Sequence, residues 1–405
     1  MSDRRPALGF IFITLVIDVL GIGLIIPVAP RLVQALQGGD EEAAAGVYGW
    51  LAATYGLMQF LFAPVLGVLS DRFGRRPVIL TSLLGSGIDF FAQALAPNIT
   101  ILFITRAING ISGANITAAS AYVADVTPPE RRAAGFGMIG AAFGVGFVLG
   151  PLLGGWLGGY DIRLPFYAAG VLTVANWIYG VFVLPESLPR ERRRALDWRR
   201  VNPLSVFAGL GRHAVVAWLA LCIFLFNVAQ FGLHATWVLY TAHRYHWSPR
   251  DVGLSLALVG IGAAVVQGGV ARSAVPRFGE RATLLFGLAV ATLAYVGYGL
   301  ATHGWMIYVI IALASVGSVL GPATQSLITK TVGPHEQGET QGAITGLQSA
   351  AAVIGPIAGG STLQYFISDR APLYLPGAPF FLSAALSALG LLAAIWAVTR
   401  KPSAA

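Results

Sequence analysis

Three charged side chains, Asp18, Asp89 and Arg106, lie inside long apolar stretches of the sequence. A run of roughly 20 apolar residues is long enough to cross a bilayer as a helix. An Asp at the centre of such a helix costs roughly 2.5–3.5 kcal/mol, so a sequence keeps it where it is paired or used. Burial and a nearby arginine act on a carboxylate in opposite directions, which lets the group exchange protons near working pH. The three residues are therefore candidates for binding protons and a cationic substrate.

Two interpretations of these charges stay open at this point. At about 1.5 Å of rise per residue, Asp89 and Arg106 come close to each other in depth, so the two can form an ion pair. A permanent pair would only fix how the helices pack. In the other interpretation Asp18, which lies on a glycine-rich helix, takes up a proton and binds a cationic substrate in alternation, and Asp89 and Arg106 assist it.

The composition assigns the chain to the membrane. Hydrophobic residues make up 56% of its 405 residues and charged residues only 11%, whereas a soluble domain carries about 25% charged residues. An all-α fold with twelve membrane-spanning helices is expected. The predicted spans are 7–30, 46–69, 77–96, 99–123, 134–157, 164–184, 214–240, 251–272, 282–301, 304–329, 340–366 and 377–398. The single cysteine, Cys222, excludes an internal disulfide and is expected as a small buried side chain.

Basic residues predict how the chain lies in the membrane. With both termini in the cytoplasm, most of the 26 Lys and Arg residues fall in cytoplasmic loops, as the positive-inside rule requires. The net charge of +8 therefore reflects topology and not a nucleic-acid partner. The longest loop, 185–213, is expected as a basic linker between a six-helix bundle at 1–184 and a second at 214–405. Its arginines either set the orientation in a solvated linker or bind anionic lipid headgroups.

The two halves of the sequence repeat each other at an offset of 205 residues. RFGRRPVILT at 72–81 matches RFGERATLLF at 277–286, and GPLLGG at 150–155 matches GPIAGG at 355–360. The repeat predicts two pseudo-symmetric bundles that rock against each other and open a central site alternately to each side.

The polar loop between the second and third spans is a candidate gate. Gly67 permits close helix approach, and Asp71 can cap a helix or pair with a base. Asp125, at the end of the fourth span, is expected to pair with an arginine of this loop or with Arg131 or Arg132. Anchoring of basic residues on the cytoplasmic side is the alternative role. The residues of the candidate gate are Gly67, Asp71, Arg72, Gly74, Arg75, Arg76 and Asp125.

The fifth span carries a Gly-Pro motif, GFVLGPLLGG, at 146–155. Proline removes a helix hydrogen bond, and glycines at i and i+4 let two backbones approach closely. Pliable and tightly packed helices suit a rocking transporter and seal it against proton leak. Ordinary close packing explains the last glycine, and its counterpart Gly360, equally well. The motif residues are Gly146, Gly150, Pro151, Gly154 and Gly155.

Polar and aromatic side chains within the spans are candidates for binding the substrate. They are Gln59, Asn109, Asn115, Asn227, Gln230, His234, Trp237, Gln267 and Gln325. His234 could change its charge near neutral pH, or it could be a packing residue with satisfied hydrogen bonds. Trp50, Tyr240 and Trp247, near span ends, are expected as interfacial anchors. The sequence contains no glycine-rich phosphate loop, metal-ligand spacing or nucleophile–base arrangement, so neither a resident cofactor nor enzymatic activity is expected.

The whole chain resembles the major facilitator superfamily. GVLSDRFGRR at 67–76 is similar to that family's loop between helices two and three, and GFVLGPLLGG to its antiporter motif. Arg106 with Gly110 is similar to its fourth-helix arginine motif. The resemblance implies a transporter of twelve helices, and it implies that Asp71 contacts a helix end of the second half.

A narrower resemblance joins the chain to the bacterial tetracycline/proton antiporters. ITLVIDVLGIGLIIPV at 13–28 and HEQGETQG at 335–342 carry it. These proteins exchange a tetracycline–divalent-metal cation for a proton. The second half departs from them, because their ninth-helix acid and eighth-helix histidine correspond here to Val290 and Ala263.

The sequence therefore favours a proton-coupled antiporter that exports tetracycline-like or other amphipathic drugs across the bacterial inner membrane. Its partners would be the drug, a proton and the lipid bilayer, with a divalent metal only as cargo, and nothing demands more than a monomer. A proton-coupled importer of the same fold and a non-transporting membrane sensor are the rivals. The Gly-Pro motif argues against the importer, and the lack of a sizeable soluble domain argues against the sensor.

Overall fold

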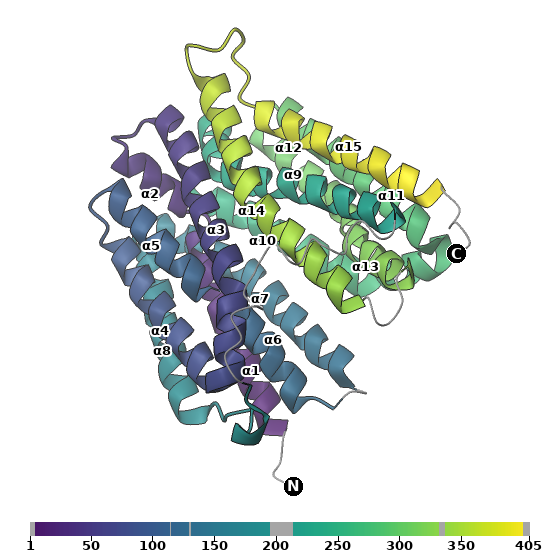
Figure 1. Ribbon diagram of the computed structural model, residues 1–405. Coiled ribbons are helices and arrows are strands. Elements are labelled where there is room, and N and C mark those ends of the chain that lie inside the picture. The colour runs from purple at the N-terminus through teal and green to yellow at the C-terminus, as the bar shows by residue number, and fades with distance from the viewer. Residues whose placement is uncertain (1–4, 114, 129–130, 195–213, 332–336, 400–405) are drawn as a thin grey trace. The chain divides into compact units, whose positions relative to one another are not determined.

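The computed structural model describes residues 5–113, 115–128, 131–194, 214–331 and 337–399. Among these residues, twelve helical segments are long and apolar enough to cross a membrane (Figure 1). Apolar runs of this length form helices because lipid offers no partner for a backbone N–H or C=O. The twelve segments coincide with the twelve predicted spans, so the all-α membrane fold is confirmed.

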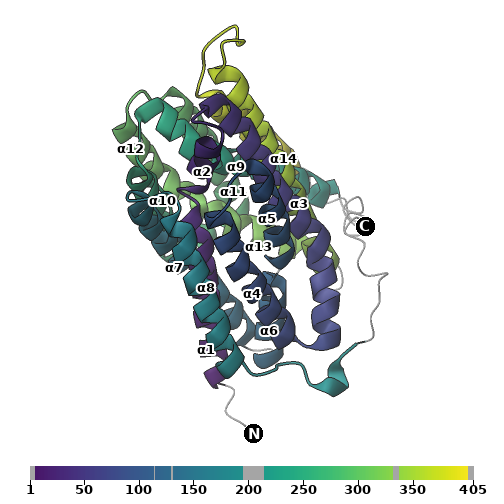
Figure 2. The same cartoon turned by 90° about the vertical axis from the view of Figure 1, so that its left-hand side faces the viewer.

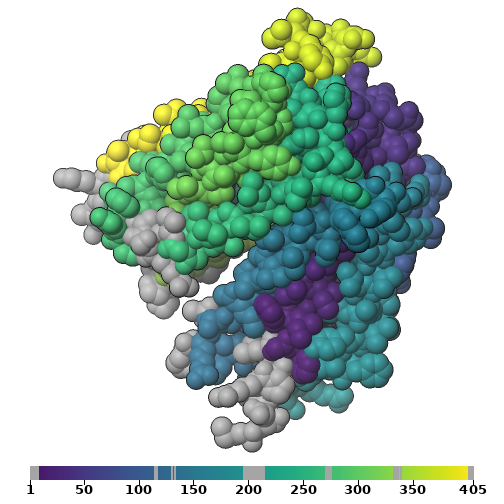
Figure 3. Space-filling view, turned by 180° about the vertical axis from the view of Figure 1, so that it is seen from behind, coloured from purple at the N-terminus to yellow at the C-terminus, as the bar shows by residue number. Residues whose placement is uncertain are grey.

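In the first half of the chain, α1 contacts the last three helices. They are α1 (Arg5–Ile25), α2 (Ala29–Leu36), α3 (Glu41–Phe73), α4 (Arg75–Ala94), α5 (Ile99–Ser112), α6 (Asn115–Val126), α7 (Arg132–Gly158) and α8 (Leu164–Val183). Helix α1 packs against both α7 and α8 (Figure 3). Helices α4 and α8 lie side by side (Figures 1 and 2).

In the second half of the chain, α9 likewise contacts the last three helices. They are α9 (Ala214–Tyr245), α10 (Pro249–Val265), α11 (Ala271–Leu300), α12 (Gly304–Ala314), α13 (Leu320–Thr331), α14 (Gln337–Ile367) and α15 (Ala378–Thr399). A π-helical turn, Val266–Val270, follows α10, and a 3-10 turn, Ser315–Val319, joins α12 to α13. Helix α9 packs against α14 and α15.

Three predicted spans depart from a uniform α-helix in the described part of the structure. The first, predicted over 7–30, breaks at residues 26–28 because Pro27 has no N–H to donate, and α2 carries it on to Leu36. The fourth breaks between α5 and α6, next to Gly113. The tenth changes to a 3-10 turn at Ser315–Val319, which is the equivalent place in the repeat. Broken helices commonly form transporter binding sites, because their freed backbone groups can face a ligand.

Each half builds its core from equivalent residues. The first core includes Ile79, Leu83, Ala118, Val123 and Ile139. The second includes Leu284, Leu288, Ala323, Ile328 and Ile344, each 205 positions after its counterpart. Gly74 and Gly279 also correspond, with φ angles of 109° and 79° that favour glycine. The sequence repeat is thus a repeat of packing. Cys222 is 2% exposed in the second core, as expected of a small buried side chain.

The chain forms two compact units, each of which includes a short segment from the other half of the sequence. The first unit contains the chain up to Gly38, the stretch from Thr54 into the linker, and Ser248–Ala257 at the start of α10. The second contains Gly39–Ala53, at the start of α3, and the rest of the chain beyond the linker.

Glycines explain how these short segments are held. A Cβ atom at Gly155 of α7 would lie 2.4 Å from the carbonyl oxygen of Pro249, at the start of α10. A Cβ atom at Gly360 of α14 would lie 2.6 Å from the carbonyl oxygen of Ala45, at the start of α3. The two glycines correspond in the repeat, so each Gly-Pro motif binds the first turns of a helix from the other half.

The other glycines of the motif bring α7 into backbone contact with α1. A Cβ atom at Gly146 would lie 2.7 Å from Val19 Cγ1, and one at Gly150 would lie 2.6 Å from the Cα of Gly23. One at Gly154 would lie 2.0 Å from the carbonyl oxygen of Leu24. Pro151 lies inside α7. Each of three successive turns of α7 therefore requires a glycine at this contact, because a larger side chain would overlap α1.

This contact predicts that Gly154→Ala destabilises the protein. The added methyl group would overlap Leu24, and overpacking of this kind costs about 1–3 kcal/mol. The measurement is the thermal unfolding temperature of the purified protein in detergent, which should fall. Gly144→Ala on the same helix is the control, because its Cβ would meet no atom within 4 Å. Equal unfolding temperatures for the two variants would contradict the α1–α7 contact.

Candidate functional site

Asp89 on α4 is a buried carboxylate held by two amides. It is 3% exposed. Its Oδ2 accepts a hydrogen bond from the side-chain amide of Gln93, one turn along α4, and another from Asn109 Nδ2 of α5 at 2.6 Å. Its Oδ1 is buried and has no hydrogen-bond partner among the described residues. Neutral donors thus fix one oxygen, and the other is left for a proton or a cation.

The ion pair predicted between Asp89 and Arg106 is not formed. None of the ion pairs found among the described residues includes Arg106. Its guanidinium is near enough to interact electrostatically with Asp89, but two amides already occupy the Oδ2 that it would bind. Of the two interpretations left open by the sequence, the permanent ion pair is therefore not found, because similar depth alone does not bring two side chains into contact.

Tyr55 on α3 lies within electrostatic range of the three charged residues that the sequence places inside spans. Its phenol interacts electrostatically with Arg106, Asp18 and Asp89. Asp18, on α1, is 5% exposed. The three charges lie in separate spans of the sequence, but in the structure all three are within electrostatic range of one tyrosine.

The break in the fourth span contributes a backbone acceptor to this cluster. Gln59 on α3 donates from Nε2 to the Gly113 carbonyl at 3.3 Å and to the Tyr55 hydroxyl at 3.4 Å. Gly110 lets α5 approach α3, because a Cβ there would lie 2.6 Å from the carbonyl oxygen of Tyr55. Gln59 and Asn109, both predicted as substrate candidates, thus belong to one polar cluster.

This arrangement can exchange a proton for a cation. Two carboxylates and one guanidinium carry one net negative charge when Asp18 and Asp89 are both ionised. Either a proton or a cationic ligand cancels that charge, and the energy involved is large because the surroundings have a low dielectric constant.

Two members of the cluster, Gln93 and Tyr55, were not among the residues predicted from the sequence. Gln93 stands four residues after Asp89, a spacing that places both on one face of a helix, so a signal for it was present. Tyr55 carried no comparable signal, because tyrosines in spans are usually packing or interfacial residues.

In the second unit, four of the predicted substrate candidates lie on α9, and three of them are polar. Gln230 Nε2 lies 3.0 Å from His234 Nε2, and Tyr295 of α11 donates to Gln230 Oε1 at 2.7 Å. His234 is exposed. Asn227, in contrast, donates to the carbonyl oxygen of Ile223 in its own helix at 2.8 Å.

Trp237, the remaining candidate on α9, is part of an aromatic cluster. It is 4% exposed and packs edge-on against Tyr298 and Phe380. Tyr240 and Trp247, expected as interfacial anchors, are also buried, at 0% and 7% exposure. That expectation was wrong for these two because aromatic partners from neighbouring helices enclose them.

The other candidates lie apart from these clusters. Gln267 is exposed in the π-helical turn, and Gln325 of α13 donates to Gln341 Oε1 of α14 at 2.9 Å. The side chain of Asn115 lies outside the described part of the structure. Within that described part, no group of three His, Cys, Asp or Glu residues is arranged to hold a metal ion.

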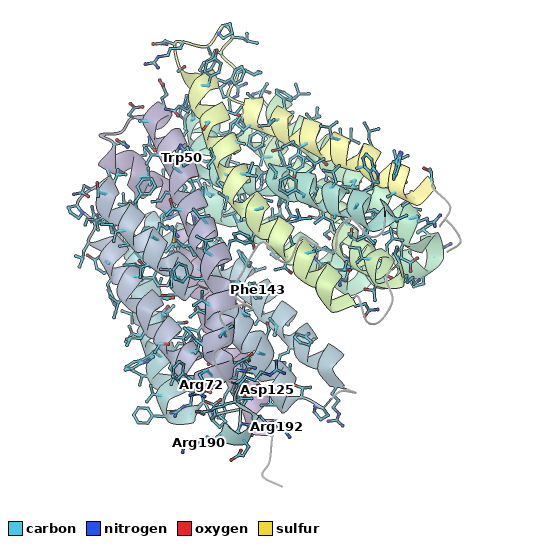
Figure 4. The ribbon with its side chains drawn as sticks, viewed as in Figure 1. Trp50, Arg72, Asp125, Phe143, Arg190 and Arg192 are labelled. Atoms are coloured by element: carbon cyan, nitrogen blue, oxygen red, sulfur yellow. The ribbon has the colours of Figure 1, made fainter. Side chains whose placement is uncertain are left out.

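Arg75 is the centre of the candidate gate. Its Nη1 lies 2.7 Å from Asp71 Oδ1, and its Nε lies 3.1 Å from Asp125 Oδ2. Asp125 therefore has a loop arginine as its partner, one of the two expected arrangements. Asp71, which the resemblance placed against the second half, pairs here within its own loop. Figure 4 shows the charged side chains that gather at this end of the first unit, namely Arg72, Asp125, Arg190 and Arg192.

The start of the linker contacts this loop. Glu186 Oε1 accepts from the backbone N–H of Arg75 at 2.9 Å, and a Cβ atom at Gly74 would lie 2.2 Å from Glu186 Oε2. Arg76 donates to the carbonyl oxygen of Val181. Close helix approach at Gly67 is not found, because a Cβ there would meet no atom within 4 Å.

The second half reverses the charges of the pair formed by Arg75 and Asp125. Glu280 and Lys330, each 205 positions after Arg75 and Asp125, form an ion pair. Ser326 also donates to Glu280 Oε1 at 3.2 Å. The acid and the base have changed places while the contact between the two spans is kept.

Comparison with known proteins agrees with this architecture. The sequence model of the Major Facilitator Superfamily matches residues 11–356 and 273–405. The chain is 42% identical to the class C tetracycline resistance protein of Escherichia coli, over 87% of this chain and 88% of that protein. It is 36% identical to the class D tetracycline resistance protein of Salmonella ordonez, over 99% and 98%.

A solved structure shows the same fold. The human organic anion transporter MFSD10 (TETRAN) is 25% identical, with a TM-score of 0.71 over 97% of this chain and all of that one. Together with the twelve spans, these matches exclude an enzyme and identify a multi-pass membrane transporter of small molecules. The chain belongs to the Major Facilitator Superfamily and is related to its tetracycline resistance proteins.

Proposed function

We propose that the protein is a proton-coupled antiporter that exports amphipathic, cationic drugs, tetracyclines among them, across the bacterial inner membrane. The observation that carries this proposal is the cluster of Asp18, Asp89 and Arg106 around Tyr55, in which Asp89 Oδ1 is left open. The tetracycline resistance proteins among its relatives support the substrate class.

Coupling would follow from mutual exclusion. A cationic drug and a proton both neutralise the same carboxylates, so binding of one releases the other. Proton entry from outside would then discharge the drug outward, with both chain termini in the cytoplasm. The loop around Arg75 and its counterpart around Glu280 would hold spans together at the cytoplasmic ends as the transporter alternates between its states.

Everted membrane vesicles with an acidic interior test the direction of transport. Tetracycline with magnesium, and then a panel of cationic dyes, should each dissipate the proton gradient when added outside, because every drug taken up releases a proton. The optical signal of a pH-sensitive dye reports this. A gradient that grows when drug is added would instead show a symporter, and binding without flux would show a sensor.

Asp18→Asn should abolish drug-driven proton release, because the amide cannot take up and release a proton at working pH. The variant should fold normally, since Asn has almost the same shape. Size-exclusion elution and unfolding temperature serve as the controls for folding. Proton release at the wild-type rate by this variant would remove Asp18 from the coupling mechanism.

The ion pair between Glu280 and Lys330 can be tested by exchanging its two charges. Glu280→Lys and Lys330→Glu should each slow drug export by placing like charges together, and the double exchange should restore it. The unfolding temperature should change little in all three variants, because an ion pair at the protein surface contributes little to stability. Unchanged export in both single variants would show that the pair has no part in gating.

A further inference from the structure

A hydrogen-bonded chain of three side chains in the second unit has no role in the mechanism proposed above. It runs from Tyr295 on α11 to Gln230 and then His234 on α9, with distances of 2.7 Å and 3.0 Å. Tyr295 is 2% exposed, Gln230 is half-buried and His234 is exposed. The chain therefore connects the interior of the bundle to an accessible imidazole ring.

In this hydrogen-bonded chain, the chemistry of each group decides which side chain donates and which accepts. Among the described residues, the Tyr295 hydroxyl has only Gln230 as a side-chain partner. If it accepted from the Gln230 amide nitrogen, its own O–H would be buried without an acceptor, which is costly. Tyr295 therefore donates to Oε1, and this fixes the orientation of the amide.

The fixed amide in turn selects one form of the histidine. The Gln230 nitrogen can only donate, so His234 Nε2 must accept and carries no proton. The ring is then neutral with its proton on Nδ1, because a protonated imidazole has no acceptor to offer Gln230. The Nδ1–H remains as a donor on an exposed side chain.

The surrounding sequence is free of charge. No Asp, Glu, Lys or Arg occurs at 214–243 or at 282–329, which include most of α9, α11, α12 and α13. A ligand that meets these helices is therefore recognised through hydrogen bonds and apolar contact. The first unit differs, because its cluster holds Asp18, Asp89 and Arg106.

We propose that Tyr295 is a positioning residue that holds His234 as a neutral Nδ1–H donor for an oxygen acceptor of the transported drug. This inference rests on the proposed function for the identity of the site. It names the substrate class more closely, as cations that also carry carbonyl or enol oxygens.

Nuclear magnetic resonance of the full-length protein with 15N-labelled histidine tests the positioning step without transport. The His234 signals are assigned from their loss in His234→Gln. The wild type should show protonated Nδ1 and unprotonated Nε2, and Tyr295→Phe should give a mixture of both tautomers. Tyr298→Phe, on the same helix, is the matched control and should leave the tautomer unchanged. A proton on Nε2 in the wild type would overturn the proposal.

Ligand binding tests the specificity step. Dissociation constants are measured for tetracycline with magnesium, which is rich in oxygen acceptors, and for ethidium, a cation that has none. Tyr295→Phe and His234→Leu should weaken tetracycline binding about three- to tenfold, the effect of one lost hydrogen bond. Ethidium binding should not change, and His234→Gln, which keeps a donor, should recover most of the tetracycline affinity.

The two assays separate this inference from the proposed function. Equal weakening for both ligands, no weakening, or no tetracycline binding by the wild type would overturn the inference even if the vesicles show antiport. The expected tautomer and selectivity with no proton release in vesicles would support the inference and reject the antiporter.

Discussion

A charge inside a membrane must find its partners within the protein, because lipid supplies none. Much of the first unit follows from this constraint. Asp89 is held by Gln93 and Asn109 from two helices, while Tyr55 links it electrostatically to Asp18 and Arg106. The break in the fourth span supplies a backbone carbonyl to the same cluster. These partners stabilise the carboxylate and still leave one oxygen open, as an exchange of proton for cation requires.

The helices that carry these charges are placed by glycine. Gly146, Gly150 and Gly154 bring α7 into backbone contact with α1, the helix of Asp18. Gly155 and Gly360 hold the first turns of α10 and α3 in the same way. Because both halves use corresponding positions, the packing is equivalent in the two units. The repeat is therefore present in the structure as well as in the sequence.

Although the two halves pack alike, the polar and charged side chains inside them differ. The first unit holds intramembrane charges, whereas the second offers the neutral chain of Tyr295, Gln230 and His234. At the loops, the Arg75–Asp125 contact becomes Glu280–Lys330 with the signs reversed. A repeated scaffold therefore preserves positions and contacts, and leaves the charge at each position free to change.

The sequence by itself determined the membrane class, the twelve spans, the repeat and the three intramembrane charges, because apolar runs and fixed offsets are properties of the linear chain. The tertiary structure decided which side chains meet. Arg106 had a suitable depth for Asp89, yet amides of Gln93 and Asn109 took that place. Trp237 was a substrate candidate by its position in a span, and in the structure it packs against Tyr298 and Phe380. Depth along a helix can be counted from the sequence, but the direction of a side chain around that helix depends on neighbours that are distant in the chain.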